Sequence, residues 1–176
     1  MRWERLFEDL EAQLAAAQAQ EARVGLVELV RAERATTRLA DRLRASTGLS
    51  LRVQVGFLPG EPDAAVDGDL VDMGADWLLL AERANGRALV PLAAVQAVAG
   101  LAPYAAPEDG STPARLGLAH VLRALSRDRV EVAVFTEART LVGRLDRVGA
   151  DHVDVTAAAG PPWTVPIAAL RVVRSR

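Results

Sequence analysis

One stretch of this chain occurs twice, and that repetition constrains the fold more than any other feature of the sequence. Residues 67–98 align without a gap on residues 142–173, with 11 identities in 32 positions. The preceding stretches also correspond, residues 39–55 with residues 118–134. The offset changes from 79 to 75, which predicts four extra residues near 59–63 in the first copy. A match of this length predicts two structural units of one kind, because sequence repeats reflect repeated architecture.

Each copy is predicted to hold one helix and five short strands. Apolar residues at three- and four-residue steps indicate helix up to about residue 46, and again over residues 114–126. Alternating apolar and polar residues indicate strands over residues 49–55, 66–70, 77–81, 88–91 and 95–98, then over residues 130–135, 140–147, 152–156, 163–166 and 170–173. Five short twisted strands bury their inner face best by curling into a small barrel, which also removes exposed edges. The predicted fold is α+β and mainly β, with two tandem helix-plus-five-strand barrels.

The predicted domain boundaries follow this pattern. They are an N-terminal helical region at 1–48, a first small barrel at 49–101, a linker rich in Pro and small residues at 102–113, and a helix plus second barrel at 114–176. Leu6, Leu10 and Leu14 lie on the apolar stripe of the N-terminal region and are candidate self-association residues. That stripe either packs on its own barrel or pairs with another copy of the chain.

Several classes of protein are disfavoured. The chain has no cysteine, which excludes disulfides and thiolate metal sites. It has no apolar run long enough for a membrane span, and its charged N-terminus lacks the apolar core of a signal peptide, so a cytoplasmic location is expected. Its two histidines, His120 and His152, fall in different parts of the repeat and next to no nucleophile or metal-ligand pattern. We expect no catalytic residues, no metal site and no cofactor, and thus not an enzyme.

Charge differs between the copies. All 21 basic residues are arginine, and the net charge is -4 over residues 49–101 and +4 over residues 113–176. Arginine suits phosphate recognition, although a solvated arginine-rich surface is the plainer interpretation. Candidate nucleic-acid contacts in the second copy are Arg139, Arg144, Arg147, Arg171 and Arg174. Candidate stacking positions are Trp77, His152 and Trp163, and for the two tryptophans packing in the core or rim of a barrel is the plainer interpretation.

The repeated motifs resemble a known family. Gly68-Asp69-Leu70 and Gly143-Arg144-Leu145 in the second strand, with Val-Pro-x-Ala-Ala before the last strand, are similar to the Sm-like family, which includes the Hfq-type RNA chaperones. This resemblance implies the small barrel fold and an association with RNA. The family's base-binding Asn and its Tyr-Lys-His segment are absent here, so the resemblance carries over the fold and not the RNA pocket. Other SH3-like barrels, such as PRC-type barrels, share the strand pattern and are alternative assignments.

The divergent charges suggest where function resides. Asp69 and Asp72 of the first copy correspond to Arg144 and Arg147 of the second, so the acidic unit is predicted to contact the basic one, within the chain or between chains. Two functions follow from the sequence. The first is nucleic-acid-associated regulation, with RNA favoured over DNA and the second barrel as contact surface. The alternative is a structural or scaffolding protein that self-assembles or binds a protein partner through its helix and barrels.

Overall fold

The structure, a computed structural model, describes residues 35–83, 86–106 and 116–175. The chain divides into two compact units, residues 1–38 and residues 39–176. In the first unit the description covers residues 35–38, of which 35 and 36 are helical. Leu6, Leu10 and Leu14 lie outside the described residues, so their proposed self-association stays a prediction. All that follows concerns the second unit.

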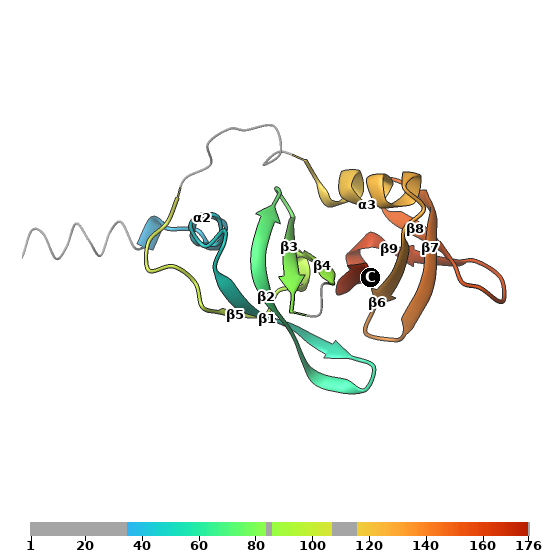
Figure 1. Cartoon of the computed structure of the whole chain (residues 1–176), viewed down its shortest axis with the longest axis horizontal. Coiled ribbons are helices and arrows are strands. Elements are labelled where there is room, and N and C mark those ends of the chain that lie inside the picture. The colour runs from blue at the N-terminus through green and yellow to red at the C-terminus, as the bar shows by residue number, and fades with distance from the viewer. Residues whose placement is uncertain (1–34, 84–85, 107–115, 176) are drawn as a thin grey trace, which may run out of the picture. The chain divides into compact units, whose positions relative to one another are not determined.

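The second unit contains the two repeats, and their elements appear in the same order (Figure 1). The first repeat consists of α2 (Leu39–Ala45), β1 (Ser50–Leu58), β2 (Glu61–Met73), β3 (Trp77–Glu82), β4 (Arg87–Pro91), the short 3-10 helix η1 (Leu92–Ala94) and β5 (Ala97–Ala99). The second consists of α3 (Leu118–Arg127), β6 (Glu131–Phe135), β7 (Thr140–Val148), β8 (His152–Thr156), β9 (Trp163–Pro166), η3 (Ile167–Ala169) and β10 (Val172–Ser175). The positions predicted for the ten strands are confirmed to within a few residues.

The predicted pair of closed barrels is wrong. All ten strands form one open antiparallel sheet, in the order β5-β1-β2-β3-β4-β10-β6-β7-β8-β9. In each repeat the last strand does return to pair with the first, β5 with β1 and β10 with β6. Closing the first barrel would need β4 to pair with β5. Instead β4 pairs with β10, Leu89 opposite Val173 and Ala88 opposite Arg174. We call this β4–β10 pairing the seam.

Side chains on both seam strands tie the two repeats together. The described residues form two apolar cores, one per repeat. Because side chains alternate across a strand, Ala88 and Val90 of β4 enter the first core, while Leu89 enters the second. On β10, likewise, Val172 enters the first core and Val173 the second. Each repeat therefore completes the core of the other, which explains why β4 pairs with β10 rather than with its own repeat.

Helix α3 is also held by the first repeat. The indole Nε1–H of Trp77 donates to the Leu116 carbonyl at 2.8 Å, and the Leu118 N–H donates to Asp76 Oδ1 at 2.7 Å. The carboxylate thus satisfies one of the unpaired N–H groups at the start of α3, where a negative charge is favourable. The repeated Gly-Ala-Asp turn consequently has a specific role in the first copy, which is to fix α3 of the second.

The segment after β5 runs along α2. The Ala102 N–H donates to the Ser46 hydroxyl at 2.9 Å, and the Ala106 N–H donates to the Asp41 carbonyl at 2.9 Å. Arg42 reaches the Ala102 carbonyl at 3.0 Å, and Ala102 itself is buried. Residues 102–106, predicted as part of the linker, are therefore tied to the first repeat by hydrogen bonds.

Strands β1 and β6, the first strands of the two repeats, correspond in the structure at a different offset from the one in the sequence alignment. Leu51 pairs with Gly68 and Val132 with Gly143. Since Gly143 follows Gly68 by 75 residues, Val132 is the counterpart of Leu51 at an offset of 81, not the aligned 79. The first copy therefore carries six extra residues rather than four. They lengthen the hairpin of β1 and β2, whose strands continue past the others in Figure 1.

Candidate nucleic-acid interface

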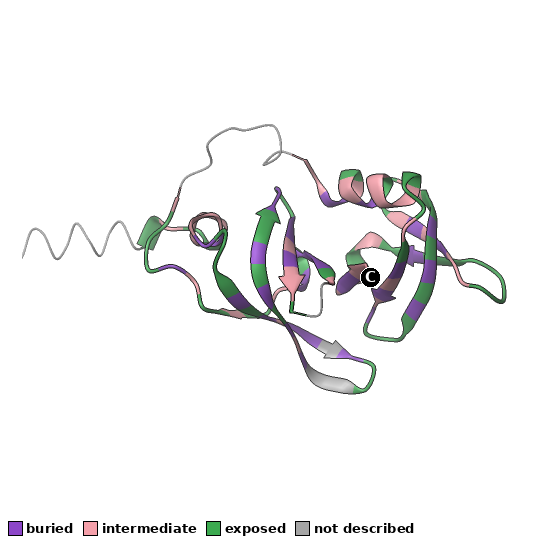
Figure 2. Cartoon of the chain, in the orientation of Figure 1, coloured by how far each residue is buried: buried purple, intermediate pink, exposed green. Residues whose placement is uncertain are grey.

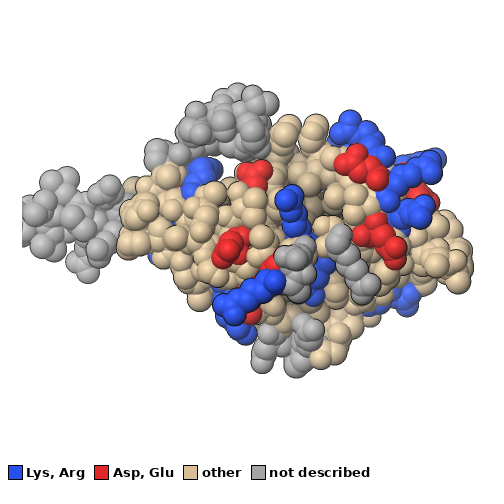
Figure 3. Space-filling view, in the orientation of Figure 1, with Lys and Arg blue, Asp and Glu red and all other residues tan. Residues whose placement is uncertain are grey.

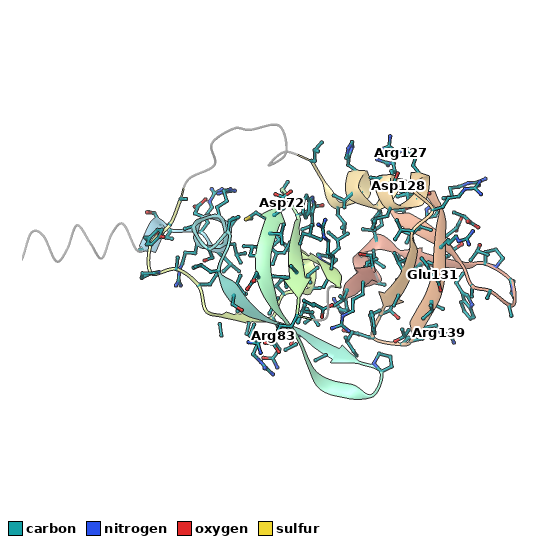
Figure 4. All side chains as sticks on the ribbon, viewed as in Figure 1. Asp72, Arg83, Arg127, Asp128, Glu131 and Arg139 are labelled. Atoms are coloured by element: carbon teal, nitrogen blue, oxygen red, sulfur yellow. The ribbon has the colours of Figure 1, made fainter. Side chains whose placement is uncertain are left out.

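A groove of about 370 Å³ at one end of the second repeat brings together three residues singled out from the sequence. Arg139 comes from the turn between β6 and β7, Trp163 from β9, and Arg171 from the segment before β10. The Arg139 guanidinium carbon lies 3.9 Å from the centroid of the Trp163 ring, a cation–π contact. We call this the arginine–tryptophan groove; Figure 4 labels Arg139 at its place on the β6–β7 turn.

The turn that carries Arg139 is fixed by a buried threonine. The Thr136 N–H and hydroxyl both donate to the Arg139 carbonyl at 3.0 Å, and the Arg139 N–H donates back to the Thr136 hydroxyl at 3.1 Å. Thr136 is only 7% exposed, so this network is shielded from water and persists. The backbone of Arg139 is therefore held in place before any ligand arrives. Sequence reasoning missed Thr136, although its return bond to Arg139 is a typical threonine turn pattern.

Arg171 is positioned from both its backbone and its side chain. Its N–H donates to the Phe135 carbonyl at 2.9 Å, and its guanidinium contacts Glu137 Oε1 at 2.5 Å. The guanidinium is mostly buried, with 22% of the side chain exposed, whereas Glu137 is 60% exposed. Arg171 Nε is buried and has no partner among the described atoms. The groove thus holds two guanidiniums and one carboxylate around an exposed indole, a combination that suits a base stacked on tryptophan with a phosphate nearby.

The other arginines of the second copy do not join this groove. Arg144 and Arg147 are exposed on β7, opposite Glu131 and Asp154 of the neighbouring strands. The outward direction of Arg144 follows from the alternation of buried and exposed residues along β7, which Figure 2 shows as alternating colours. Arg147 departs from this alternation, because the pairing with β8 shifts register between Leu145 and Arg147 and leaves both residues 146 and 147 exposed. Figure 3 shows basic side chains gathered over the region of α3 and β7, interspersed with acidic ones.

Arg174 belongs to the seam. Its guanidinium forms an ion pair with Glu82 at 3.1 Å and lies 5.0 Å from the centroid of the Phe135 ring. Among the ion pairs between described residues, this is the one that joins the two repeats, and none joins Asp69 to Arg144 or Asp72 to Arg147. Asp69 and Asp72 are both exposed on β2. The predicted contact of Asp69 and Asp72 with Arg144 and Arg147 is therefore not made as an ion pair between described residues of one chain, and between chains it stays a prediction.

The remaining stacking candidates differ in exposure. Trp77 is only 4% exposed and packs in the second core, so it offers no free face for a base. His152 occupies the corresponding place in the second repeat, where its Nδ1 lies 2.8 Å from Asp151 Oδ1 and 41% of its side chain is exposed. This hydrogen bond, and then the charge of His152, lowers the pKa of the Asp151 carboxyl below its ordinary value. Only Trp163 among the three combines an exposed ring with a neighbouring cation.

Two further observations bear on chemistry. Within residues 35–83, 86–106 and 116–175, no three His, Asp or Glu side chains gather in a way that could hold a metal ion. No helix in the same ranges is both long and apolar enough to cross a membrane.

Comparison with models of known protein families gives no match, and comparison with curated proteins gives no relative.

Proposed function

We propose that this protein binds single-stranded nucleic acid through the arginine–tryptophan groove and acts in the cytoplasm as a non-enzymatic regulator. The observation that carries the proposal is the Arg139 guanidinium stacked on the exposed ring of Trp163, with Arg171 in the same groove. Arg139 covers one face of the indole, and Trp163 is still 43% exposed, so we assign the remaining face to an unstacked base and the guanidinium to a nearby phosphate. RNA is favoured over DNA because of the sequence resemblance to Sm-like proteins, and a single strand over a duplex because bases in a duplex are already stacked.

The groove predicts a local contact rather than a general affinity for polyanions. The whole chain carries a net charge of -2, and Glu137 balances part of the charge on Arg171. Few phosphates would be neutralised, so the slope of log affinity against log salt should be shallow, about -0.7 per phosphate contacted. Base stacking then supplies a larger share of the affinity than in a highly basic binder.

The test is fluorescence anisotropy with short labelled RNA and DNA strands at low salt. Trp163→Ala should weaken binding by roughly 1–3 kcal/mol, the usual worth of a stacked base, and Arg139→Ala should weaken it as well. Arg52→Ala is the matched control, because Arg52 is an exposed arginine in the first repeat that pairs with Asp67. Absence of binding at low salt, or equal losses for Arg139→Ala and Arg52→Ala, would reject the proposal.

Self-assembly is a second candidate, supported by the two open edges of the sheet. The seam joins the fourth strand of one repeat to the fifth strand of the other. Among the described strands, the other fourth strand, β9, and the other fifth strand, β5, each have one unpaired edge. A second copy could pair there, although Pro166 in β9 and Pro162 beside it lack the N–H groups that such a ladder uses. Light scattering over a concentration series decides this: a strict monomer rules out the scaffold role.

A further inference from the structure

Arg129, which follows the end of α3, has a left-handed backbone conformation that is unfavourable for any residue with a Cβ. Its φ is 51°, and it is the one residue other than glycine with a positive φ among those described. The Arg129 N–H donates to the Ser126 carbonyl at 3.2 Å, and the Val130 N–H donates to the Leu125 carbonyl at 3.3 Å. This is the pattern of a left-handed helix end, where glycine is usual because it has no Cβ.

The first repeat contains glycine at the corresponding place. Counting back 81 residues, the offset that the strand register gives, places Gly48 at the position of Arg129, each two residues before the start of its strand. Gly48 has a φ of 86° and open space around its Cα. Corresponding positions before the first strand thus adopt a left-handed backbone in both copies, with glycine in one and arginine in the other, although the hydrogen bonds differ: the Gly48 N–H donates to the Leu70 carbonyl. Backbone strain kept at a position where the relaxed alternative exists is an indication of function.

Arg129 lines a pocket of about 400 Å³ together with Arg127 and Arg144. All three arginines are exposed, and none makes an ion pair or side-chain hydrogen bond within the described residues. We call this the three-arginine pocket. Figure 4 labels Arg127 at the end of α3, at the other end of the second repeat from Arg139, so this pocket is separate from the arginine–tryptophan groove.

One acidic residue, Asp146, also lines the pocket, and its polar groups are engaged elsewhere. The Asp146 carboxylate accepts a hydrogen bond from the Thr156 hydroxyl, and the Asp146 carbonyl accepts one from Ser126 at 3.3 Å. Glu131 lies opposite Arg144 in the sheet, and Asp128 follows α3, but neither forms an ion pair with the three arginines in the described structure. Three guanidiniums with free N–H groups can bind one tetrahedral anion from several sides.

We propose that the three-arginine pocket is a phosphate-binding site, with Arg129 held in a left-handed conformation to complete it. The ligand chemistry is a phosphate group, from a small phosphorylated molecule or from the end or backbone of a nucleic acid. The site is independent of the function proposed for the arginine–tryptophan groove. A purely structural role is the competing explanation, since arginines at the end of a helix also stabilise its dipole.

Arg129→Gly separates these explanations, because it removes the guanidinium and relaxes the backbone in one step. The probe is inorganic pyrophosphate, titrated into the full chain at low salt by calorimetry. We expect Arg129→Gly to raise the melting temperature and to weaken pyrophosphate binding by about tenfold, the worth of one charge-assisted hydrogen bond. Arg123→Ala, which removes an exposed arginine of α3 outside the pocket, should leave binding unchanged.

Two comparisons complete the test. An oligonucleotide with a 5′-phosphate and the same strand without it, each measured on Trp163→Ala, show whether a nucleic-acid phosphate enters the pocket when the groove is disabled. Equal affinity for both strands, together with pyrophosphate binding, assigns the site to a small phosphorylated ligand. No pyrophosphate binding by the unmodified chain, or unchanged binding by Arg129→Gly, overturns the proposal even if the groove binds nucleic acid.

Discussion

Ala88 and Trp163 occupy the same place in the two repeats, yet Ala88 is completely buried and Trp163 is 43% exposed. The cause is the sheet order. Ala88 lies on β4, which the seam covers with β10, whereas Trp163 lies on β9, the edge strand that no described strand covers. A large ring could not fit at the seam, but the edge leaves space for it and for Arg139 beside it. The arginine–tryptophan groove therefore lies at the β9 end of the sheet, where the large ring has space.

The seam predicts unequal losses of stability for alanine substitutions at two corresponding positions. Leu89 is 2% exposed at the seam, so Leu89→Ala should lower the free energy of unfolding by about 2–5 kcal/mol. Thr164, its counterpart on β9, is exposed and donates to Asp154 at 2.6 Å. Thr164→Ala should therefore cost less than about 1 kcal/mol. Urea denaturation of both variants measures the difference, and equal losses would contradict the seam.

The ion pair between Arg174 and Glu82 should stabilise the contact between the repeats modestly. Both side chains are about three-quarters buried, with 26% and 22% exposed. A double-mutant cycle of Arg174→Ala and Glu82→Ala should give a coupling free energy on the order of 1 kcal/mol, the upper range for exposed pairs. The same cycle on Arg52 and Asp67, whose side chains are 64% and 57% exposed, should give less. Fully additive effects for Arg174 and Glu82 would show that the pair contributes nothing to stability.

Substituting the glycine of either Gly-x-Leu motif should destabilise the fold. A Cβ at Gly68 would lie 2.5 Å from the Ala81 carbonyl oxygen, and one at Gly143 would meet the Thr156 carbonyl in the same way. Since backbone atoms cannot move aside, Gly68→Ala and Gly143→Ala should each lower the free energy of unfolding by about 1–3 kcal/mol. Val71→Ala is the control on β2, because Val71 is 45% exposed. Thermal or urea unfolding measures all three, and a neutral Gly143→Ala would be inconsistent with this strand contact.

The pKa of Asp151 should respond to His152. The hydrogen bond from His152, and then its charge, lowers the pKa of this carboxyl below the ordinary value of 3.8. A lowered folded-state pKa stabilises the fold at pH values above 3.8, and that contribution is lost as the pH falls through the folded-state pKa. Carboxyl titration by NMR should place the Asp151 midpoint below 3.8, and His152→Gln should raise it. A midpoint unaffected by His152→Gln would disprove the interaction.

Local pattern was sufficient to place the strands and the turns. The ten strands could be placed because apolar and polar side chains alternate along them. The glycine of each Gly-x-Leu motif is explained by a backbone carbonyl of the next strand, which leaves no room for a Cβ. The same alternation concealed the offset between Leu51 and Val132, because a slip of two residues keeps every side chain on its own face. The sequence could therefore identify the strand and still misplace its counterpart.

The candidate site was only partly predictable. Arg139, Arg171 and Trp163 were singled out separately, by charge and by ring, and folding brought them to one groove. Arg127 and Arg129 were missed, although two arginines around Asp128 at a helix end were a visible signal. The sequence could not predict the left-handed backbone of Arg129, because glycine, asparagine and aspartate, rather than arginine, are common in that conformation.

The sequence by itself determined a repeated unit of one helix and five strands, because local periodicity and turn residues specify each element. Only the tertiary structure decided that β4 pairs with β10 and that the sheet stays open. A strand edge presents the same N–H and C=O groups to any antiparallel neighbour, so the hydrogen bonds do not select the partner. The side chains that do select it, Leu89 and Val173 in one core and Ala88 and Val172 in the other, act only when both repeats are folded together.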